Sequence, residues 1–427
     1  MADSPRRIVL AAVGSLGDLH PYLAIALGLR ERGHEVIVAT SACYREKIAS
    51  LGLPFRAIRP DSDFLTDPAR ASWYMHPRWG TVNIGLELTG PNFRKTYDDL
   101  LAASAGADLI ITHPLVAYSA RLVSEKHGIP WLSTMISPLG FLSAYDLPIV
   151  TVVPTLCHVL RLLGPTVAVP VMWLNKRATR FLAKDWYTLR AELGLPQTHE
   201  GNPLLDSHSP RLVLALWSKL FADQQPDWPQ NTVLTGFPLF DQHGSDQLPP
   251  DLSKFLDAGP PPIVFTVGFS AAALAGRFFD ASIEAATRLN RRAVLITGRE
   301  STTLSSPLPP NILRIDYAPF SQLFPRATAV VHAGGIGTTG LVMRAGVPSL
   351  VVPFAHDQPD NAARLARLGA ARVLPAGRYT PARATCELRL LLDDASYTDR
   401  AQEISRQVRH EDGTCAACDA IDHLLGV

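Results

Sequence analysis

Residues 330–361, VVHAGGIGTTGLVMRAGVPSLVVPFAHDQPDN, contain the pattern that decides the fold of this chain. An apolar strand pattern ends at His332, and the glycine-rich segment 334–340 leads from it into a helical pattern. A second apolar segment, 349–353, predicts another strand. A strand, a glycine loop, a helix and a strand in this order predict a parallel α/β unit.

The glycine-rich segment also has the composition of an anion-binding site. Glycines let backbone N–H groups approach oxygen atoms, and a helix N-terminus favours negative charge. We therefore predict a diphosphate site, with the polar tip at 356–361 gripping the group attached to the diphosphate. An ordinary tight turn is the alternative. The residues expected to contact this ligand are His332, Gly334, Gly335, Gly337, Thr338, Asp357, Gln358 and Asn361.

Length and composition narrow the class of protein. A chain of 427 residues has room for two or three domains. Its net charge of +1 gives no overall field that would recruit nucleic acid. The five cysteines are scattered, and Cys415-x-x-Cys418 has no second pair, so we expect neither a disulfide framework nor a metal site. Residues 1–7 are polar and lead directly into a strand, which favours a cytoplasmic protein.

The apolar segment 147–174 has Arg161 as its only charged residue. It is interrupted by several prolines, each of which removes a helix hydrogen bond, so we expect it not to span a membrane. A lipid-facing surface, with peripheral contact at the inner face of the membrane, and an acceptor-lining surface both remain open.

Strand patterns separated by helical patterns occur in both halves of the chain. They predict two Rossmann-like α/β domains with a cleft between them, where ligands commonly bind. The predicted N-terminal domain is 1–225, a turn-rich linker region is 226–262, and the second domain is 263–405. Residues 406–427 form a C-terminal helix, for which a return to the N-terminal domain is one alternative.

The loop GSLGDLHP, residues 14–21, follows the first predicted strand but lacks the G-x-G-x-x-G spacing of a dinucleotide site. Asp18 is a candidate general base that accepts a proton from an incoming hydroxyl. The alternative is a helix N-cap whose carboxylate bonds the N2 or N3 amide. His20 is a second candidate base, and His113, at the end of another strand, could orient the acceptor or the base.

Four segments carry a resemblance to a known family: GSLGDLHP, VFTVGFS (264–270), APFSQLFPRATAVVHAGGIGTTG and PFAHDQPDNA. Together they resemble inverting family-one UDP/TDP-glycosyltransferases of the GT-B fold, which include sterol, macrolide and glycopeptide members. Within that family, the segments at 127–148 and 227–241 are similar to the rhamnosyltransferases of rhamnolipid synthesis.

The resemblance implies a nucleoside-diphosphate sugar as co-substrate, bound mainly by the second domain, with no cofactor and no metal. It places Gly268 and Ser270 opposite the diphosphate, Phe320 at the nucleobase, and Gly17 on the donor side. Asp357 and Gln358 occupy the pair that hydrogen-bonds sugar hydroxyls. Asp18 takes the position of the base in a single displacement that inverts the anomeric centre. The leaving diphosphate is neutralised by His332 and the helix terminus.

Aromatic residues in the loops 60–100 and 135–180 make a lipophilic acceptor plausible, although any one of them could equally fill a core. These residues are Phe64, Trp73, Tyr74, Trp79, Phe93, Phe141, Tyr145 and Trp173. We assign the acceptor side to His113, Ser137, Phe141 and Tyr145. The leading hypothesis is transfer of rhamnose from dTDP-rhamnose to a hydroxyalkanoyl ester. The alternatives are transfer from UDP-glucose to a sterol, polyketide or phenol, a nucleotide-sugar epimerase, and a sugar-nucleotide sensor.

Overall fold

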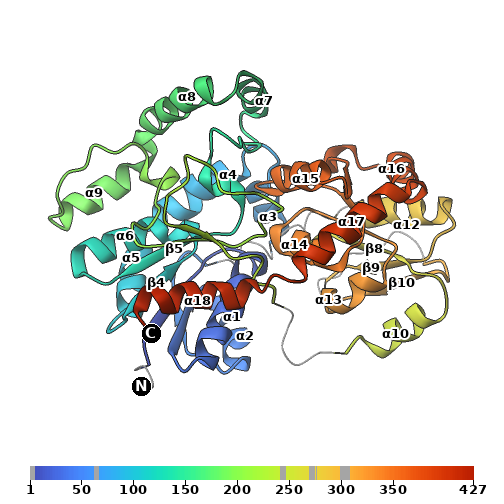
Figure 1. Cartoon of the computed structure of the whole chain (residues 1–427), viewed down its shortest axis with the longest axis horizontal. Coiled ribbons are helices and arrows are strands. Elements are labelled where there is room, and N and C mark those ends of the chain that lie inside the picture. Colours follow the sequence, from blue (N-terminus) through green and yellow to red (C-terminus); the bar gives the residue numbers. More distant parts are fainter. Residues whose placement is uncertain (1–4, 62–66, 241–246, 269–274, 276, 299–307) are drawn as a thin grey trace. The chain divides into compact units, whose positions relative to one another are not determined.

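The computed structural model describes residues 5–61, 67–240, 247–268, 275, 277–298 and 308–427. They form two compact units, each built on its own parallel sheet (Figure 1). The first unit comprises Met1–Phe64, Trp79–Pro238 and Asp412–Val427, and the second comprises Leu65–Arg78 and Leu239–Glu411. The predicted pair of parallel-sheet α/β domains is confirmed.

The sheet of the first unit has the strand order β3-β2-β1-β4-β5-β6-β7, with every pair parallel. The chain leaves β1 in one direction and later returns to its other side as β4, so the strand order reverses between these two strands. Ligands of open α/β sheets bind at such a reversal, beyond the carboxyl ends of the strands. The strands are β1 (Arg7–Ala11), β2 (Glu35–Thr40), β3 (Phe55–Ala57), β4 (Leu109–Thr112), β5 (Trp131–Met135), β6 (Val213–Ala215) and β7 (Thr232–Leu234).

Helices lie in most of the connections between these strands, as parallel pairing favours, and the last helix of the chain also packs in this unit. The long ones are α1 (Leu16–Glu31), α5 (Gly90–Ala103), α6 (Pro114–His127), α7 (Pro154–Leu163), α8 (Pro165–Ala178), α9 (Lys184–Glu192) and α18 (Gly413–Leu425). Shorter elements are η1 (Ala42–Tyr44), α2 (Arg45–Ser50), α4 (Gly80–Asn83), η3 (Ile84–Thr89), η4 (Pro138–Phe141), η5 (Arg180–Ala183) and η6 (Pro203–Leu205).

The sheet of the second unit has the order β10-β9-β8-β11-β12-β13, again all parallel, and its order reverses between β8 and β11. Its strands are β8 (Ile263–Thr266), β9 (Ala293–Ile296), β10 (Ile312–Ile315), β11 (Ala329–His332), β12 (Ser349–Val351) and β13 (Ala371–Val373). Its helices are α3 (Pro68–Tyr74), α10 (Pro250–Asp257), α12 (Phe278–Arg288), α13 (Phe320–Leu323), η8 (Phe324–Arg326), α14 (Ile336–Ala345), α15 (Gln358–Arg367), η9 (Ala376–Arg378), α16 (Pro381–Asp393) and α17 (Ala395–Val408).

Two segments are distributed differently from the domain limits that the sequence suggested. Residues 65–78, assigned to the N-terminal domain, belong to the second unit, where Met75 lies in the hydrophobic core with Phe265. The turn-rich region 226–262 contributes β7 to the first sheet and α10 to the core of the second unit. Turn-forming prolines and glycines therefore flank regular elements here rather than forming one continuous linker.

The last helix, α18, packs against α1 in the first unit (Figure 1). The approach is close, because a Cβ atom at Gly28 would lie 2.9 Å from the Cys418 sulfur. Arg32 adds an ion pair with Asp422 at 2.7 Å, and His34 Nε2 lies 3.0 Å from the same carboxylate. Small residues and charge pairs thus fix the chain end on the first helix.

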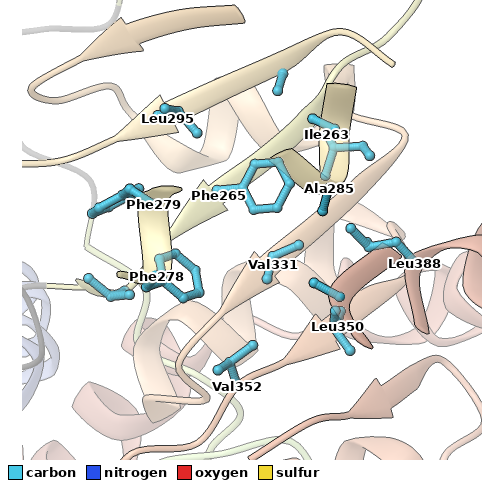
Figure 2. Packing of buried hydrophobic residues seen from close by; sticks show 14 of the residues in the cluster. Ile263, Phe265, Phe278, Phe279, Ala285, Leu295, Val331, Leu350, Val352 and Leu388 are labelled. Carbon is cyan, nitrogen blue, oxygen red and sulfur yellow. The ribbon is translucent and has the colours of Figure 1, made fainter. Parts of the chain in front are cut away.

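The core of the second unit is a layer of aliphatic and aromatic side chains between the sheet and its helices (Figure 2). Phe265 of β8 lies at its centre and is fully buried, with Val331 of β11 and Leu295 of β9 on the adjacent strands. Phe278 and Phe279 of α12 cover this layer from one side. Within the described residues, no helix has both the length and the apolar character needed to cross a membrane.

We predict that Phe265→Ala lowers the free energy of unfolding by about 3–5 kcal/mol, because it removes a buried ring and leaves a cavity. Urea denaturation measures this change. Leu390→Ala on α16 is the control, since Leu390 is 47% exposed, and its effect should stay within about 0.5 kcal/mol. Equal effects of the two substitutions would contradict the described core.

Candidate active site

The loop after β1 places a carboxylate at the strand reversal of the first sheet. Helix α1 begins at Leu16, so Ser15 is its N-cap and Asp18 stands at the third helical position. The Asp18 carboxylate accepts hydrogen bonds from the Ser15 backbone N–H at 2.7 Å and from the Ser15 hydroxyl at 2.8 Å. The prediction of Asp18 as an N-cap is therefore wrong. A serine three residues earlier takes that position, and Asp18 bonds back to it as in a capping box.

Gly14 is needed for this arrangement. Its φ of +130° is a backbone conformation that residues with a side chain rarely adopt. A Cβ atom at Gly14 would lie only 2.5 Å from Asp18 Oδ2. The first glycine of the loop therefore makes the space that the carboxylate occupies.

His113 lies beside this carboxylate. It follows β4, the strand paired with β1, and it caps the N-terminus of α6. Its Nδ1 accepts a hydrogen bond from the Leu115 N–H at 3.2 Å, so the ring hydrogen of the neutral form is on Nε2. Nε2 lies 3.6 Å from Asp18 Oδ1. The histidine side chain is 4% exposed and the aspartate side chain 29% exposed, so Asp18 is the member of the pair open to solvent.

Opposing effects set the pKa of Asp18. Burial alone would raise it, but hydrogen bonding and charge interaction with His113, together with the Ser15 donors, outweigh burial and hold the pKa below the ordinary value of 3.8. Burial lowers the pKa of His20 to about 3, with a further contribution from the charge on Lys47. Near neutral pH the site thus contains an ionised Asp18 and a neutral His20. Gly17, at the second position of α1, is exposed.

The residues assigned to the acceptor side differ in their surroundings. Ser137 is buried and caps η4 by accepting the Leu139 N–H at 3.3 Å. Phe141 is also buried and stacks on Trp228, with 4.2 Å between ring centroids. Tyr145 is 47% exposed, so it is the one of these three residues that an acceptor could contact from solvent.

The other aromatic residues of the two loops divide in the same way. Tyr74 and Phe93 are buried, whereas Trp73, Trp79 and Trp173 are exposed. Phe64 lies outside the described residues. Of the seven described aromatic residues of these loops, three are buried and four are exposed, so aromatic composition alone does not identify an acceptor surface.

The second unit places its glycine-rich segment at the reversal between β8 and β11. Gly268 follows β8 with a φ of +71°, and Gly334 follows β11 with a φ of +86°. A Cβ at Gly334 would lie 2.9 Å from a Val351 methyl group and 3.1 Å from the Gln358 carbonyl oxygen, so only glycine fits there. Ser270, the predicted neighbour of Gly268, lies outside the described residues.

The N-terminus of α14 has no side-chain cap among the described residues. Its N-cap is Gly335, which has no side chain to bond the first amides, and the N–H groups of the first helical turn have no acceptors within the helix. A Cβ built at Gly335 or at Gly337 meets no atom within 4 Å among the described residues. Thr338, at the third helical position, is half-buried. Backbone donors and free space therefore coincide at the positive end of a ten-residue helix.

His332 adds a side-chain donor at the end of β11. Its Nδ1 accepts the Gly334 N–H at 3.2 Å, so the neutral ring carries its hydrogen on Nε2. The residue is 1% exposed, and Nε2 has no hydrogen-bond partner in the part of the chain that the structure describes. Burial lowers its pKa to about 3. The neutral ring therefore presents an N–H donor, and the role of His332 in neutralising a diphosphate stays a prediction.

The polar tip after β12 is tied to the glycine-rich segment. Asn361 Nδ2 donates to the Gly334 carbonyl at 2.9 Å and to Asp357 Oδ2 at 2.8 Å. Gln358 Oε1 accepts the N–H groups of Phe354 and Ala355 at 2.8 and 3.2 Å. Gln358 and Asn361 are buried, whereas Asp357 is half-buried. The sequence identified Asp357, Gln358 and Asn361 as site residues but did not predict these hydrogen bonds. The bond from Asn361 to Gly334 joins residues 27 positions apart, and no local sequence pattern indicates such a contact.

Phe320 begins α13 and stacks on Phe324, with ring centroids 4.6 Å apart. It is half-buried, so part of its surface is accessible. Contact between Phe320 and the nucleobase stays a prediction.

We predict that His113→Asn raises the pKa of Asp18. The asparagine oxygen can still accept the Leu115 N–H as an N-cap, but Nε2 is lost, so Ser15 alone opposes the effect of burial. Asp18 is ionised above its pKa, so its charged form should disappear at a higher pH in the variant. Carbon-13 NMR titration of the carboxyl group measures the shift. His127→Asn, at the other end of α6, is the matched control, and an unchanged Asp18 pKa in His113→Asn would refute the pairing.

Comparisons with known proteins agree with this architecture. Residues 8–139 match the glycosyltransferase family 28 N-terminal domain, and residues 281–413 match the C-terminal domain of the erythromycin biosynthesis protein CIII-like family. The chain is 32% identical to O-mycaminosyltylonolide 6-deoxyallosyltransferase of Streptomyces fradiae, over 97% of each chain.

A sterol 3-beta-glucosyltransferase of Candida albicans is 29% identical over 97% of this chain and 27% of its own length. In fold, the chain is similar to the glycosyltransferase VinC in complex with dTDP, with a TM-score of 0.70 and 20% identity over 99% of this chain and all of that one. From the two domain matches and the similarity to the Streptomyces fradiae enzyme along the whole chain, we conclude that this protein belongs to the family-one glycosyltransferases of the GT-B fold.

Proposed function

We propose that this glycosyltransferase is an inverting enzyme that transfers a deoxyhexose from a nucleoside diphosphate to a hydroxyl of a lipophilic acceptor. The observation that carries the proposal is the N-terminus of α14, uncapped by any described side chain, beside the buried donor His332. Backbone amides at a helix N-terminus and a neutral imidazole N–H suit the oxygens of a diphosphate. No described residue fills the space around Gly335 and Gly337, which would let those oxygens approach the backbone.

The donor that we propose is dTDP-rhamnose. The similarity to a 6-deoxyallosyltransferase supports a deoxyhexose, and the fold shared with a dTDP-bound glycosyltransferase supports the nucleotide. The similarity to sterol glucosyltransferases supports a second candidate, transfer from UDP-glucose to a sterol or polyketide. The proposed acceptor of the first candidate is a hydroxyalkanoyl ester.

In the proposed mechanism, the acceptor oxygen attacks the anomeric carbon while its proton passes to the Asp18 carboxylate. The bond between the anomeric carbon and the diphosphate oxygen breaks, and the diphosphate leaves with the electron pair. His332 and the first amides of α14 stabilise the charge that develops on the leaving group. His113 is assigned as a positioning residue, because it lies against Asp18 and is itself shielded from solvent.

Calorimetric titration without added metal tests the donor. The titrants are dTDP, UDP, dTDP-rhamnose and UDP-glucose. The proposal predicts the tightest binding for dTDP-rhamnose, and a preference for UDP-glucose would favour the second candidate. If none of the four nucleotides bound, the assignment of the α14 N-terminus as a diphosphate site would fail.

We predict that Asp18→Asn lowers kcat about 10²- to 10⁴-fold, the usual contribution of a general base, and leaves the dissociation constant of the nucleotide unchanged. Asparagine is similar in size but cannot take the proton. Initial-rate kinetics and calorimetry separate the two effects. A normal kcat would leave Asp18 as part of the capping box only.

We predict that Gly337→Ala weakens nucleotide binding without lowering stability. The new methyl group would stand where the diphosphate is proposed to bind, while alanine is the better helix former. Gly377→Ala in η9 is the matched control, because its Cβ also meets no described atom within 4 Å. Calorimetry should show weaker binding for Gly337→Ala alone. Equal affinity of both variants and the wild type would remove Gly337 from the donor site.

A further inference from the structure

The helices α7 and α8 and the turn η5 present a large apolar surface on the first unit. We call this the α7–α8 surface and define it by its exposed residues, Leu156, Val159, Leu162, Leu163, Val167, Val169, Trp173, Leu174, Phe181 and Leu182. The most exposed are Leu162 at 74% and Phe181 at 73%. Scattered single apolar residues are normal on a protein surface, but ten exposed apolar side chains on two paired helices and the following turn form the kind of group that marks an interaction site.

The outward orientation of these residues follows from how the two helices pack. Leu160 of α7 and Ala168 of α8 form a small buried cluster with Leu147 and Ala144. That contact uses one face of each helix, and the remaining faces carry many apolar side chains among the polar ones expected at a water interface. Figure 1 shows the pair set apart from β4 and β5 of the same unit. The small cluster alone does not account for the apolar composition of the outer faces.

The charges of this segment are all of one sign. Between residues 147 and 184 the charged side chains are Arg161, Lys176, Arg177, Arg180 and Lys184, and the segment contains no aspartate or glutamate. Lys176 pairs with Asp206 at 2.7 Å. The Arg177 guanidinium lies 4.5 Å from the centre of the exposed Trp173 ring, so a basic and an aromatic group stand together on the surface.

We infer that the α7–α8 surface docks on an anionic lipid membrane. Leucine, valine and phenylalanine side chains can enter the acyl boundary, tryptophan prefers the headgroup level, and long basic side chains can reach lipid phosphates. A second copy of this chain fits the charges less well, because pairing two such surfaces would bring their basic residues together. This inference goes beyond the proposed transfer reaction and does not depend on it.

Flotation with lipid vesicles tests the inference on the full chain. Vesicles of phosphatidylcholine mixed with phosphatidylglycerol are compared with vesicles of phosphatidylcholine alone. The wild type should bind the mixed vesicles more strongly, and binding should weaken as salt rises. Absence of binding to the mixed vesicles would overturn the inference.

Substitutions locate the contact. Leu162→Glu combined with Trp173→Glu should lower the partition coefficient at least about tenfold, because it removes two inserting side chains and adds negative charge. Leu390→Glu on α16 is the matched control, since that leucine is also exposed, and it should bind like the wild type. The double variant Arg177→Gln/Lys184→Gln should reduce the preference for anionic vesicles. The double variant Lys254→Gln/Arg291→Gln removes two positive charges from the second unit and is the control, which should keep that preference.

Circular dichroism checks that each variant is folded, and sedimentation velocity measures the oligomeric state. Vesicle binding that survives in Leu162→Glu/Trp173→Glu would show that another surface makes the contact and would refute the assignment. If the wild type were a dimer that did not bind vesicles, and Leu162→Glu/Trp173→Glu were a monomer, the α7–α8 surface would instead be an interface between two copies of this chain.

Discussion

Parallel strand pairing determines where the candidate site residues lie in both sheets. In each sheet every described pair is parallel, so the carboxyl ends of all strands lie at one edge. The reversal of strand order then opens a position at β1 and β4 in one sheet and at β8 and β11 in the other. Asp18 and His113 meet at the first position, and Gly268, His332 and Gly334 gather at the second.

Each of these positions requires a glycine, because its backbone has a positive φ and a Cβ atom there would lie too close to neighbouring atoms. Gly14 makes room for the Asp18 carboxylate, and Gly334 fits between Val351 and Gln358. Two histidines then repeat one local pattern: Nδ1 of His113 and of His332 accepts an amide two residues later, which fixes the hydrogen on Nε2. In the first unit Nε2 lies 3.6 Å from the Asp18 carboxylate, and neither Nε2 has a hydrogen-bond partner among the described residues.

The sequence predicted the elements whose signals are local. The strand expected to end at His332 is β11, which ends at that residue, and the glycine-rich segment marks the N-terminus of α14. Signals that depend on distant partners were missed. The sequence did not indicate Ser15 as the N-cap, because Asp18 is itself a good N-cap residue. The hydrogen bond from Asn361 to the Gly334 carbonyl has no local sequence pattern that would predict it. The aromatic residues of the two loops did not identify the acceptor side. Phe93 is buried and Trp173 is exposed, and composition alone does not predict which side chains become buried.

The assignment of α3 to the second unit and of α18 to the first means that the two units are not consecutive halves of the polypeptide. The chain passes from one unit to the other after Phe64, Arg78, Pro238 and Glu411. A single cut in the 226–262 region would leave the first half without the helix that covers α1, and the second half without Met75 in its core. Chimeras that exchange whole units with relatives therefore need junctions at all of these crossings.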